Sequence, residues 1–398
     1  MTLQLSQTHE RFVKQALFGF LLITVVGLTF SIAVSSIAMG IAIAFYVALI
    51  MLSKNGIYEP TTFDYFFLAY AIAELLSTVF SVDPSASIVN MKRLLLISIV
   101  YLTVLSIDTR QKYAWAILLL IVVTALLSII ESLLLEKIGD HLTRLGMFQH
   151  YMTAGGIKMI VVLMILPFIV QQQTPTRWRI AAALCLLPML IALVLTQTRS
   201  SWLGFLAGAS TIGIIKNKKF LLVLAGIIIF FFLLAPATFT ERATSIFDPT
   251  LRSNLTRINM ITTGWQMFLD FPVFGVGDID LKKLYVTYTE PIDPAEGGHL
   301  HNNAMTLLVT LGVVGFIAVM ALFVKIFLIE RNIVQRVSND WLYGSTSLGC
   351  FAAYIGFHVN GLFEWNFGDH EIAVLLWFTV GLSLVSQRLI GEKTAENT

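Results

Sequence analysis

The chain is 398 residues long, and 57% of its residues are apolar while 13% are charged, a balance far from that of a water-soluble domain. The net charge of +2 is spread along the sequence without a lysine- and arginine-rich cluster, which argues against a nucleic-acid partner. Cys185 and Cys350 each lie inside an apolar run, so we expect neither a disulfide framework nor a thiolate metal site. The composition therefore predicts an integral membrane protein.

The apolar residues fall into continuous runs of about 15 to 23 residues, close to the length that a helix needs to cross a bilayer core. Arg11 and Lys14 before the first run resemble the start of a signal peptide, but the apolar character continues to Leu52, which favours two retained helices. We expect an all-α, polytopic protein with a single membrane domain over residues 1–398. The predicted spans, about a dozen, are residues 16–33, 36–53, 63–80, 89–107, 113–135, 153–171, 179–196, 201–215, 219–236, 306–329, 341–361 and 371–388.

Basic residues give these spans an orientation, because cytoplasmic loops are enriched in lysine and arginine. If the N-terminus is cytoplasmic, the inner loops carry Arg11, Lys14, Lys54, Arg110, Lys112, Arg177, Arg179, Lys216, Lys218, Lys219, Arg331, Arg336, Arg388 and Lys393. Residues 237–300 then form a large loop on the outer face, and residues 252–271 within it predict an amphipathic helix lying over the bundle. Long loops usually have a function, so we expect the site on this side.

Three arginines on the predicted outer face are candidate ligands for phosphate. Arg199 lies in the polar segment Thr196–Trp202 between two apolar runs, and Arg252 and Arg257 lie in the amphipathic segment. A guanidinium is a planar fork of donors that stays charged at the membrane surface, which suits phosphate or pyrophosphate. The alternatives are a snorkelling Arg199 beside helix-capping hydroxyls, and an Arg252 that contacts lipid headgroups.

The segment Gly297–Asn303, just before an apolar helix, contains His299, His301 and Asn302. A histidine titrates near neutral pH and can take a proton from a hydroxyl group, so this segment suits general-base catalysis. A zinc site needs three or four ligands, and the segment holds no suitably spaced cysteine or carboxylate, so we expect no metal ion and no other cofactor. The alternative is a polar turn that caps the following helix.

Residues 364–371 connect the last two predicted spans and contain carboxylates beside aromatic side chains. Glu364 and Asp369 could orient a sugar through its hydroxyl groups, and a solvated loop is an equally good interpretation. Arg93 and His150 are predicted at outer helix ends, where they could complete a pocket for an anionic lipid. The short D-x-D pattern at residues 278–280 occurs often by chance, so we place no metal site there.

Taken in order, these segments resemble the O-antigen ligase family, which together with O-antigen polymerases forms a superfamily of membrane glycosyltransferases. The resemblance covers about residues 190–320, and the rest of the chain is similar only in helix number. It rests on Leu195–Arg199, Arg257 with Trp265, Phe271–Gly277, His299–Asn302 and Leu311–Gly315.

The resemblance implies an enzyme of the bacterial inner membrane that acts in lipopolysaccharide biosynthesis, with its active site and a large loop of short helices facing the periplasm. Such an enzyme transfers a glycan from undecaprenyl diphosphate to a lipid A-core sugar, without a metal ion and with inversion at the anomeric carbon. Arg199 and Arg257 match the family's phosphate-binding arginines, and His301 matches its essential histidine, as general base or as a further diphosphate contact. The implied partners are the lipid-linked glycan, the acceptor and membrane lipid.

Two other functions remain open. A polymerase of O-antigen or exopolysaccharide needs the same carrier chemistry, with another carrier-linked glycan as acceptor. A transporter of lipid-linked glycans would be favoured by charged residues at the membrane midplane. Lys158 and Lys325 are the nearest to such residues, while the other charged residues gather at the outer ends, so the charge distribution argues against transport. The ligase is the leading interpretation, and the motifs do not separate it from a polymerase.

Overall fold

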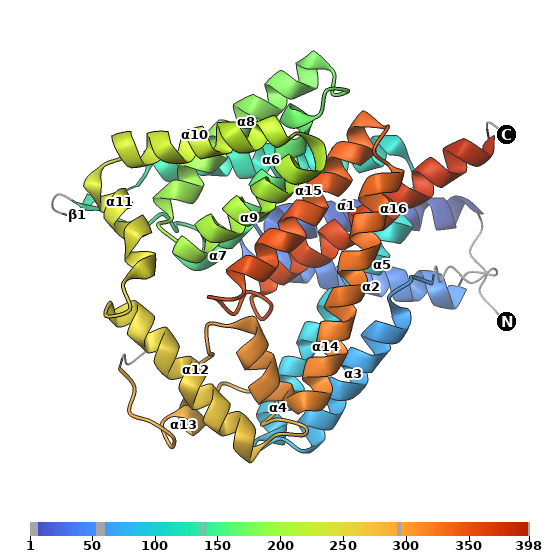
Figure 1. Cartoon of the computed structure of the whole chain (residues 1–398). Helices are drawn as coiled ribbons and strands as arrows, with labels where there is room; N and C mark the ends of the chain where they lie inside the picture. Colours follow the sequence, from blue (N-terminus) through green and yellow to red (C-terminus); the bar gives the residue numbers. More distant parts are fainter. Residues whose placement is uncertain (1–6, 53–59, 136, 139–140, 293–295, 397–398) are drawn as a thin grey trace.

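The computed structural model describes residues 7–52, 60–135, 137–138, 141–292 and 296–396, and Figure 1 shows that helices make up almost all of this part of the chain. The described strands are β1 (Lys137–Ile138) and β2 (His141–Leu142), which pair antiparallel in one short hairpin. The predicted all-α architecture is therefore confirmed.

Long helical segments occupy the positions of the predicted spans. They are α1 (Gln7–Gly27), α2 (Ile32–Leu52), α3 (Asp64–Val79), α4 (Pro84–Asn90) continuing through η1 (Met91–Ile97) into α5 (Ser98–Ser106), α6 (Arg110–Leu133), α7 (Tyr151–Val170), α8 (Thr176–Leu195), α9 (Arg199–Lys216), α10 (Lys218–Leu234), α14 (Asn303–Arg336), α15 (Trp341–Asn360) and α16 (His370–Glu396).

Seven segments in the described part of the chain are long and apolar enough to cross a membrane: α2, α4 to α5, α6, α7, α8, α14 and α16. The other helices fall short in length or composition. For example, α3 and α10 have 16 and 17 residues, fewer than the roughly 20 that a bilayer core requires. The structure thus supports a multi-pass helical membrane protein with fewer candidate spans than the sequence pattern predicts.

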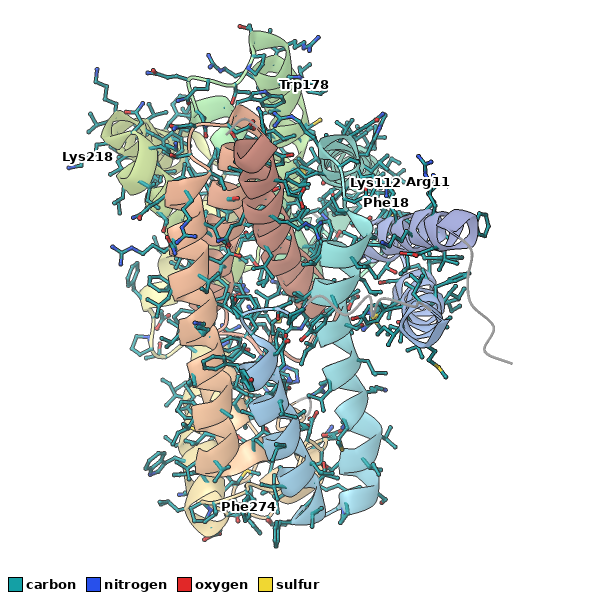
Figure 2. All side chains as sticks on the ribbon, turned by 90° about the vertical axis from the view of Figure 1, so that its right-hand side faces the viewer. Arg11, Phe18, Lys112, Trp178, Lys218 and Phe274 are labelled. Atoms are coloured by element: carbon teal, nitrogen blue, oxygen red, sulfur yellow. The ribbon has the colours of Figure 1, made fainter. Side chains whose placement is uncertain are left out.

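Residues from the predicted inner and outer loops lie at different ends of the molecule. Figure 2 shows Lys112, Trp178 and Lys218 toward one end and Phe274 at the opposite end. Helices α7, α9 and α15 pack against one another between these ends. Small residues permit close helix packing: a Cβ atom on Gly204 of α9 would lie 2.6 Å from the carbonyl oxygen of Gly356 on α15.

Helix α14 is broken at Gly312, which has φ +62° and ψ −170°. The break exposes backbone groups that bond to the turn at Phe271–Gly277: the amide of Gly277 donates to the carbonyl of Thr310, and the amide of Val313 donates to that of Pro272. A Cβ atom at Gly312 would lie 2.3 Å from the carbonyl oxygen of Val273, so only glycine fits. Two glycine-rich segments of the sequence therefore meet to form one backbone junction.

The large predicted loop folds as α11 (Ala237–Thr244), η2 (Ser245–Phe247), α12 (Arg252–Asp270) and α13 (Lys282–Tyr285). Figure 1 shows this arm, in yellow and orange, running from α10 to α14 along one end of the bundle. Helix α12 begins where the amphipathic pattern begins and buries Met260 and Met267 against the rest of the arm. Its opposite face exposes apolar side chains, as a helix at a lipid surface does: Leu255, Ile258, Ile261, Trp265 and Leu269.

Candidate functional site

Arg199 opens α9, and its buried guanidinium joins the bundle to the arm. Nη1 donates to the carbonyl oxygen and Oγ of Ser245 at 2.8 and 3.0 Å. Nη2 donates to Oγ of Ser253 at 3.0 Å and to Oδ1 of Asn254 at 2.8 Å. These four bonds fix the guanidinium in place beside the first turn of α12.

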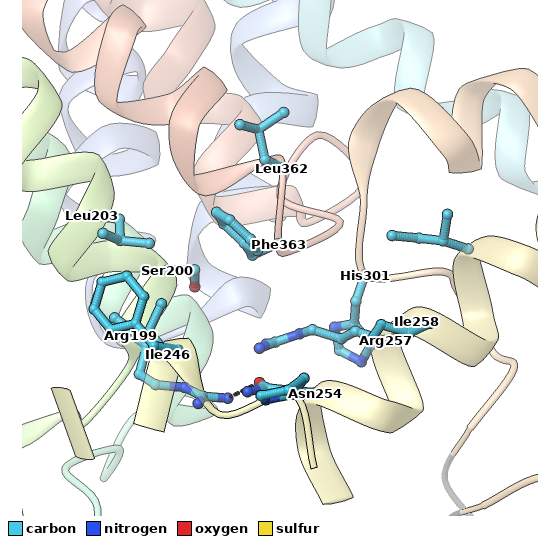
Figure 3. Close-up of a pocket in the computed structure, with 13 residues that line it drawn as sticks. Arg199, Ser200, Leu203, Ile246, Asn254, Arg257, Ile258, His301, Leu362 and Phe363 are labelled. Atoms are coloured by element: carbon cyan, nitrogen blue, oxygen red, sulfur yellow. Dashed lines mark hydrogen bonds between the residues drawn. The ribbon is translucent and has the colours of Figure 1, made fainter. Parts of the chain in front are cut away.

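Arg257 lies one turn further along α12, on the same face as Asn254, because residues three apart are neighbours on a helix. Figure 3 shows its side chain beside the ring of His301. Burial lowers the pKa of Arg257, an effect that the nearby Glu364 and Tyr151 oppose. Among the residues that the structure describes, none forms a hydrogen bond or an ion pair with this guanidinium. A partly buried cation without a partner is suited to an anionic ligand.

Two further arginines, Arg144 and Arg242, complete a cluster with Arg199 and Arg257. Nε and Nη2 of Arg144 donate to the carbonyl oxygens of Thr196 and Gln197 at 3.1 and 3.0 Å, and Nε of Arg242 donates to Gln197 at 3.2 Å. Our sequence reasoning missed both. Both could have been identified from the sequence, because arginines are uncommon in outer loops and both residues fall in predicted outer loops.

The four guanidinium groups of this cluster place several positive charges close together. Burial, together with repulsion from Arg242, Arg199 and Arg257, lowers the pKa of Arg144 to about 10, while Tyr151 acts in the opposite sense. The guanidinium carbon of Arg144 lies 3.3 Å from the centroid of the Tyr151 ring, a cation–π contact. Because these side chains remain protonated at neutral pH, the cluster creates a positive potential at the end of the bundle.

His301 precedes α14 and adopts φ +45°, a left-handed conformation that few residues other than glycine occupy. Its Nδ1 lies 2.8 Å from Oε1 of Glu364, and Nε2 of His299 lies 3.5 Å from the same oxygen. Burial acts to raise the pKa of Glu364, but hydrogen bonds and charge from the two histidines hold that pKa well below its usual range. An ionised carboxylate only accepts, so Nδ1 carries the hydrogen and Nε2 of the neutral ring keeps its lone pair.

The same three residues could hold a metal ion, because donor atoms of His299, His301 and Glu364 lie within 4.8 Å of one another. The sequence expectation of no metal overlooked Glu364, which is 63 residues away from His301. The hydrogen bond to Glu364 occupies Nδ1 of His301, and the arginines nearby oppose a cation. Hydrogen bonding therefore explains the geometry of the three residues better than metal coordination does.

The aspartates of the D-x-D pattern do not act together. Asp278 accepts from Arg93 at 2.6 Å, and Oδ1 of Asp280 accepts from the backbone amide of Lys282 at 2.9 Å. Each carboxylate thus has its own structural partner.

A cavity of about 300 Å³ brings the predicted catalytic residues together. We call it the arginine cavity; its polar lining includes Arg199, Arg257 and His301, and its apolar lining includes Leu203, Ile246, Ile258, Ile261, Leu362 and Phe363. Several of these apolar side chains are exposed. The cavity therefore combines a cationic floor with walls that suit a hydrocarbon chain.

The predicted substrate-binding residues divide into two groups. Arg93, His150, His299, Glu364 and Asp369 line a second cavity, also of about 300 Å³. By contrast, Arg252 and Asn302 lie outside the linings of both cavities.

Arg252 and Asn302 have other partners in the structure. Nη2 of Arg252 donates to the carbonyl oxygen of Ile292 at 2.6 Å. Oδ1 of Asn302 accepts from the amide of Met305 at 2.8 Å and so caps α14, while its Nδ2 donates to the carbonyl oxygen of Leu362. The capping alternative considered for the histidine segment therefore describes Asn302, and a substrate contact by either residue stays a prediction.

The fold and the site define a multi-pass helical membrane protein with an arginine- and histidine-lined cavity at one end of its bundle. Residues 184–320, about a third of the chain, match the family model described as O-antigen ligase, so the resemblance is confirmed over this part of the chain. Members of this family are membrane glycosyltransferase-like enzymes, both ligases and polymerases. No curated protein matches the chain. The matched part includes Arg199, Arg257 and His301, while Arg144 and Glu364 lie outside it.

Proposed function

We propose that this protein is an O-antigen ligase of the bacterial inner membrane, which transfers a glycan from undecaprenyl diphosphate to a lipid A-core sugar on the periplasmic side. The arginine cavity is the observation that supports this function most directly. Beside an apolar opening, it places the fixed guanidinium of Arg199 and the guanidinium of Arg257, which has no partner among the described residues. It also places there His301, whose Nδ1 lies 2.8 Å from Glu364. A diphosphate joined to a long hydrocarbon is complementary to all of these features.

The carrier lipid enters with its diphosphate toward Arg199 and Arg257. Arg199 is already fixed by four hydrogen bonds, so it loses little freedom when the ligand binds. Arg257 makes no such bonds to the described residues and gains its partner from the ligand. The hydrocarbon chain lies along Ile258 and Ile261, which belong both to the cavity lining and to the exposed apolar face of α12.

In the transfer step, Nε2 of His301 takes the proton from the acceptor hydroxyl group, and the acceptor oxygen attacks the anomeric carbon of the donor glycan. The bond between that carbon and the diphosphate oxygen breaks, and the electron pair stays on the diphosphate. Arg199 and Arg257 stabilise the growing negative charge, while Glu364 stabilises the imidazolium that forms. A single displacement inverts the anomeric centre, and every charge is met by a side chain, so the step needs no metal ion.

A test combines purified protein, undecaprenyl-diphosphate-linked glycan and lipid A core, with and without a chelator. We expect glycan on the core, loss of transfer in His301→Ala, and no effect of the chelator. Arg177→Ala is the matched control, because Arg177 lies in a predicted inner loop and its guanidinium carbon rests 5.7 Å from the ring centroid of Trp178, away from both cavities.

Each other outcome identifies another function. Growth of carrier-linked chains without modification of the core would show a polymerase. If neither acceptor receives glycan, the enzyme assignment fails and transport becomes the leading explanation. The buried ion pair between Lys158 and Glu131, 2.6 Å apart inside the bundle, would then be the first place to look for a transport function.

A further inference from the structure

The second cavity has a different chemistry from the arginine cavity. We call it the tryptophan cavity; it is lined in part by Arg93, Thr153, Glu364, Trp365, Asp369 and His301. It presents an aromatic ring, two carboxylates, a hydroxyl group and a guanidinium. An aromatic face suits the C–H groups of a sugar ring, and a few fixed polar groups suit its hydroxyl groups.

His301 is the one described residue that lines both cavities. A hydroxyl group held in the tryptophan cavity therefore approaches the histidine from a different side than a diphosphate held in the arginine cavity. A single displacement needs the attacking and leaving groups on opposite sides of the reacting carbon. Two separate cavities that share His301 as a lining residue are compatible with this requirement.

Two residues that line this cavity, Glu364 and Arg93, carry polar groups without partners among the described residues. Oε2 of Glu364 is buried and has no hydrogen-bond partner among the described residues. Nη1 of Arg93 donates to both oxygens of Asp278 at 2.6 and 2.7 Å, whereas Nε and Nη2 make no bond to any described residue. A sugar hydroxyl group can donate to the first and accept from the second, so neighbouring hydroxyl groups would satisfy both.

The charges indicate which kind of sugar fits. Arg93 is already neutralised by its ion pair with Asp278, while Glu364 and Asp369 leave negative charge in the wall. An anionic sugar would be repelled, and a neutral pyranose would not. The guanidinium carbon of Arg93 lies 5.9 Å from the ring centroid of Trp365, a cation–π contact between two residues that both line the cavity.

We propose that the tryptophan cavity is the acceptor subsite, which holds a neutral terminal sugar against Trp365 with its hydroxyl groups on Arg93 and Glu364. The acceptor oxygen then lies beside His301, and the donor diphosphate lies in the arginine cavity. This inference rests on the proposed function, but it also predicts binding that can be measured without any transfer.

The test measures binding of two separate probes to the full-length protein in detergent. One probe is core oligosaccharide freed from its lipid, and the other is a short-chain prenyl diphosphate without sugar. We expect Trp365→Ala to weaken oligosaccharide binding about tenfold, as the loss of one aromatic contact does, and to leave prenyl diphosphate binding within twofold of wild type. Arg257→Ala should show the reverse pattern.

Trp365 also packs against Phe367, with ring centroids 6.1 Å apart, so a second variant checks the fold. Trp365→Phe keeps an aromatic ring and should retain prenyl diphosphate binding, with oligosaccharide affinity between wild type and Trp365→Ala. Unchanged oligosaccharide binding in Trp365→Ala, or no binding by wild type, overturns the subsite. Loss of both probes in Trp365→Phe also overturns it, because the ring would then be structural. If both probes bind as expected and no glycan is transferred, the subsite stands and the ligase assignment fails.

Discussion

Nδ1 of His301 lies 2.8 Å from Oε1 of Glu364, although the two residues are 63 positions apart and come from different connections of the bundle. The carboxylate fixes which nitrogen of the ring carries hydrogen, and it is in turn held by a second histidine, His299. The pair has the arrangement of a general base and the group that orients it, at the boundary between two cavities.

Glu364→Gln tests this pair. Glutamine keeps the size of the side chain but removes its charge, so it stabilises the imidazolium less and permits the other tautomer. We expect the kcat of transfer to fall about a hundredfold with little change in donor KM, as for the loss of an acid–base contribution. Wild-type kcat in this variant would exclude an orienting role for Glu364.

The difference in stability between wild type and Glu364→Gln should depend on pH. The pKa of Glu364 is lowered in the folded protein. The hydrogen-bonded, ionised carboxylate of Glu364 therefore stabilises the fold above the ordinary carboxylate pKa, and this contribution disappears as the pH falls through the lowered folded value. Wild type should exceed Glu364→Gln in Tm at pH 7, and the difference should shrink below about pH 4, where an unfolded glutamate is protonated. A constant difference across this range would contradict the lowered pKa.

Arg257→Ala should lower the activity of the protein without lowering its stability. Loss of this guanidinium should lower kcat/KM by about 10² to 10³, because it removes stabilisation of the leaving diphosphate. The variant should unfold at the same or a higher Tm than wild type without substrate, since an unpaired, partly buried charge is gone. Thermal unfolding with and without prenyl diphosphate checks this. A variant that is markedly less stable without ligand would show that Arg257 has a structural partner.

Arg144→Ala tests whether the side chain of Arg144 stabilises the turn between α8 and α9. Its guanidinium bonds to the carbonyl oxygens of Thr196 and Gln197, the residues that lead into Arg199. We expect a loss of roughly 1–3 kcal/mol in stability from the unsatisfied carbonyl groups, together with a raised donor KM because Arg199 shifts. Arg144→Lys should recover part of the stability. Arg177→Ala, which removes an arginine from a predicted inner loop, should change neither quantity.

Gly312→Ala tests the junction between α14 and the turn at Phe271–Gly277. The added Cβ would lie 2.3 Å from the carbonyl oxygen of Val273, at a φ of +62°. We expect a loss of 1 kcal/mol or more, roughly the cost of a strained backbone position, and lower activity because the histidine segment precedes the same helix. Gly226→Ala in α10 is the matched control, because its Cβ would meet nothing within 4 Å. Equal Tm values for the two variants would contradict the role given to Gly312.

Added Zn²⁺ and chelators test the metal-free chemistry. A chelator should leave the transfer rate unchanged, whereas excess Zn²⁺ should inhibit by occupying His299, His301 and Glu364. His299→Ala should weaken this inhibition. Loss of activity with the chelator, restored by a divalent cation, would reverse the assignment.

The sequence by itself was sufficient for features that are encoded within one segment. Apolar runs of membrane length predict the helices, and the spacing of apolar residues predicts α12 to within a residue at each end. Polar segments that interrupt the pattern contain Arg199 and His301, and the family resemblance selects these two residues together with Arg257. The structure brings all three to one cavity. Each of these signals depends on neighbours a few positions away in the chain.

The tertiary structure alone decided the contacts between segments. It pairs His301 with Glu364, places Arg144 and Arg242 around Gln197, and gives Asn302 a capping role instead of a place in a cavity. It also gives the two cavities one shared lining residue, His301. These relationships depend on how helices cross and where connections return, and local propensity carries no information about groups that meet only after packing.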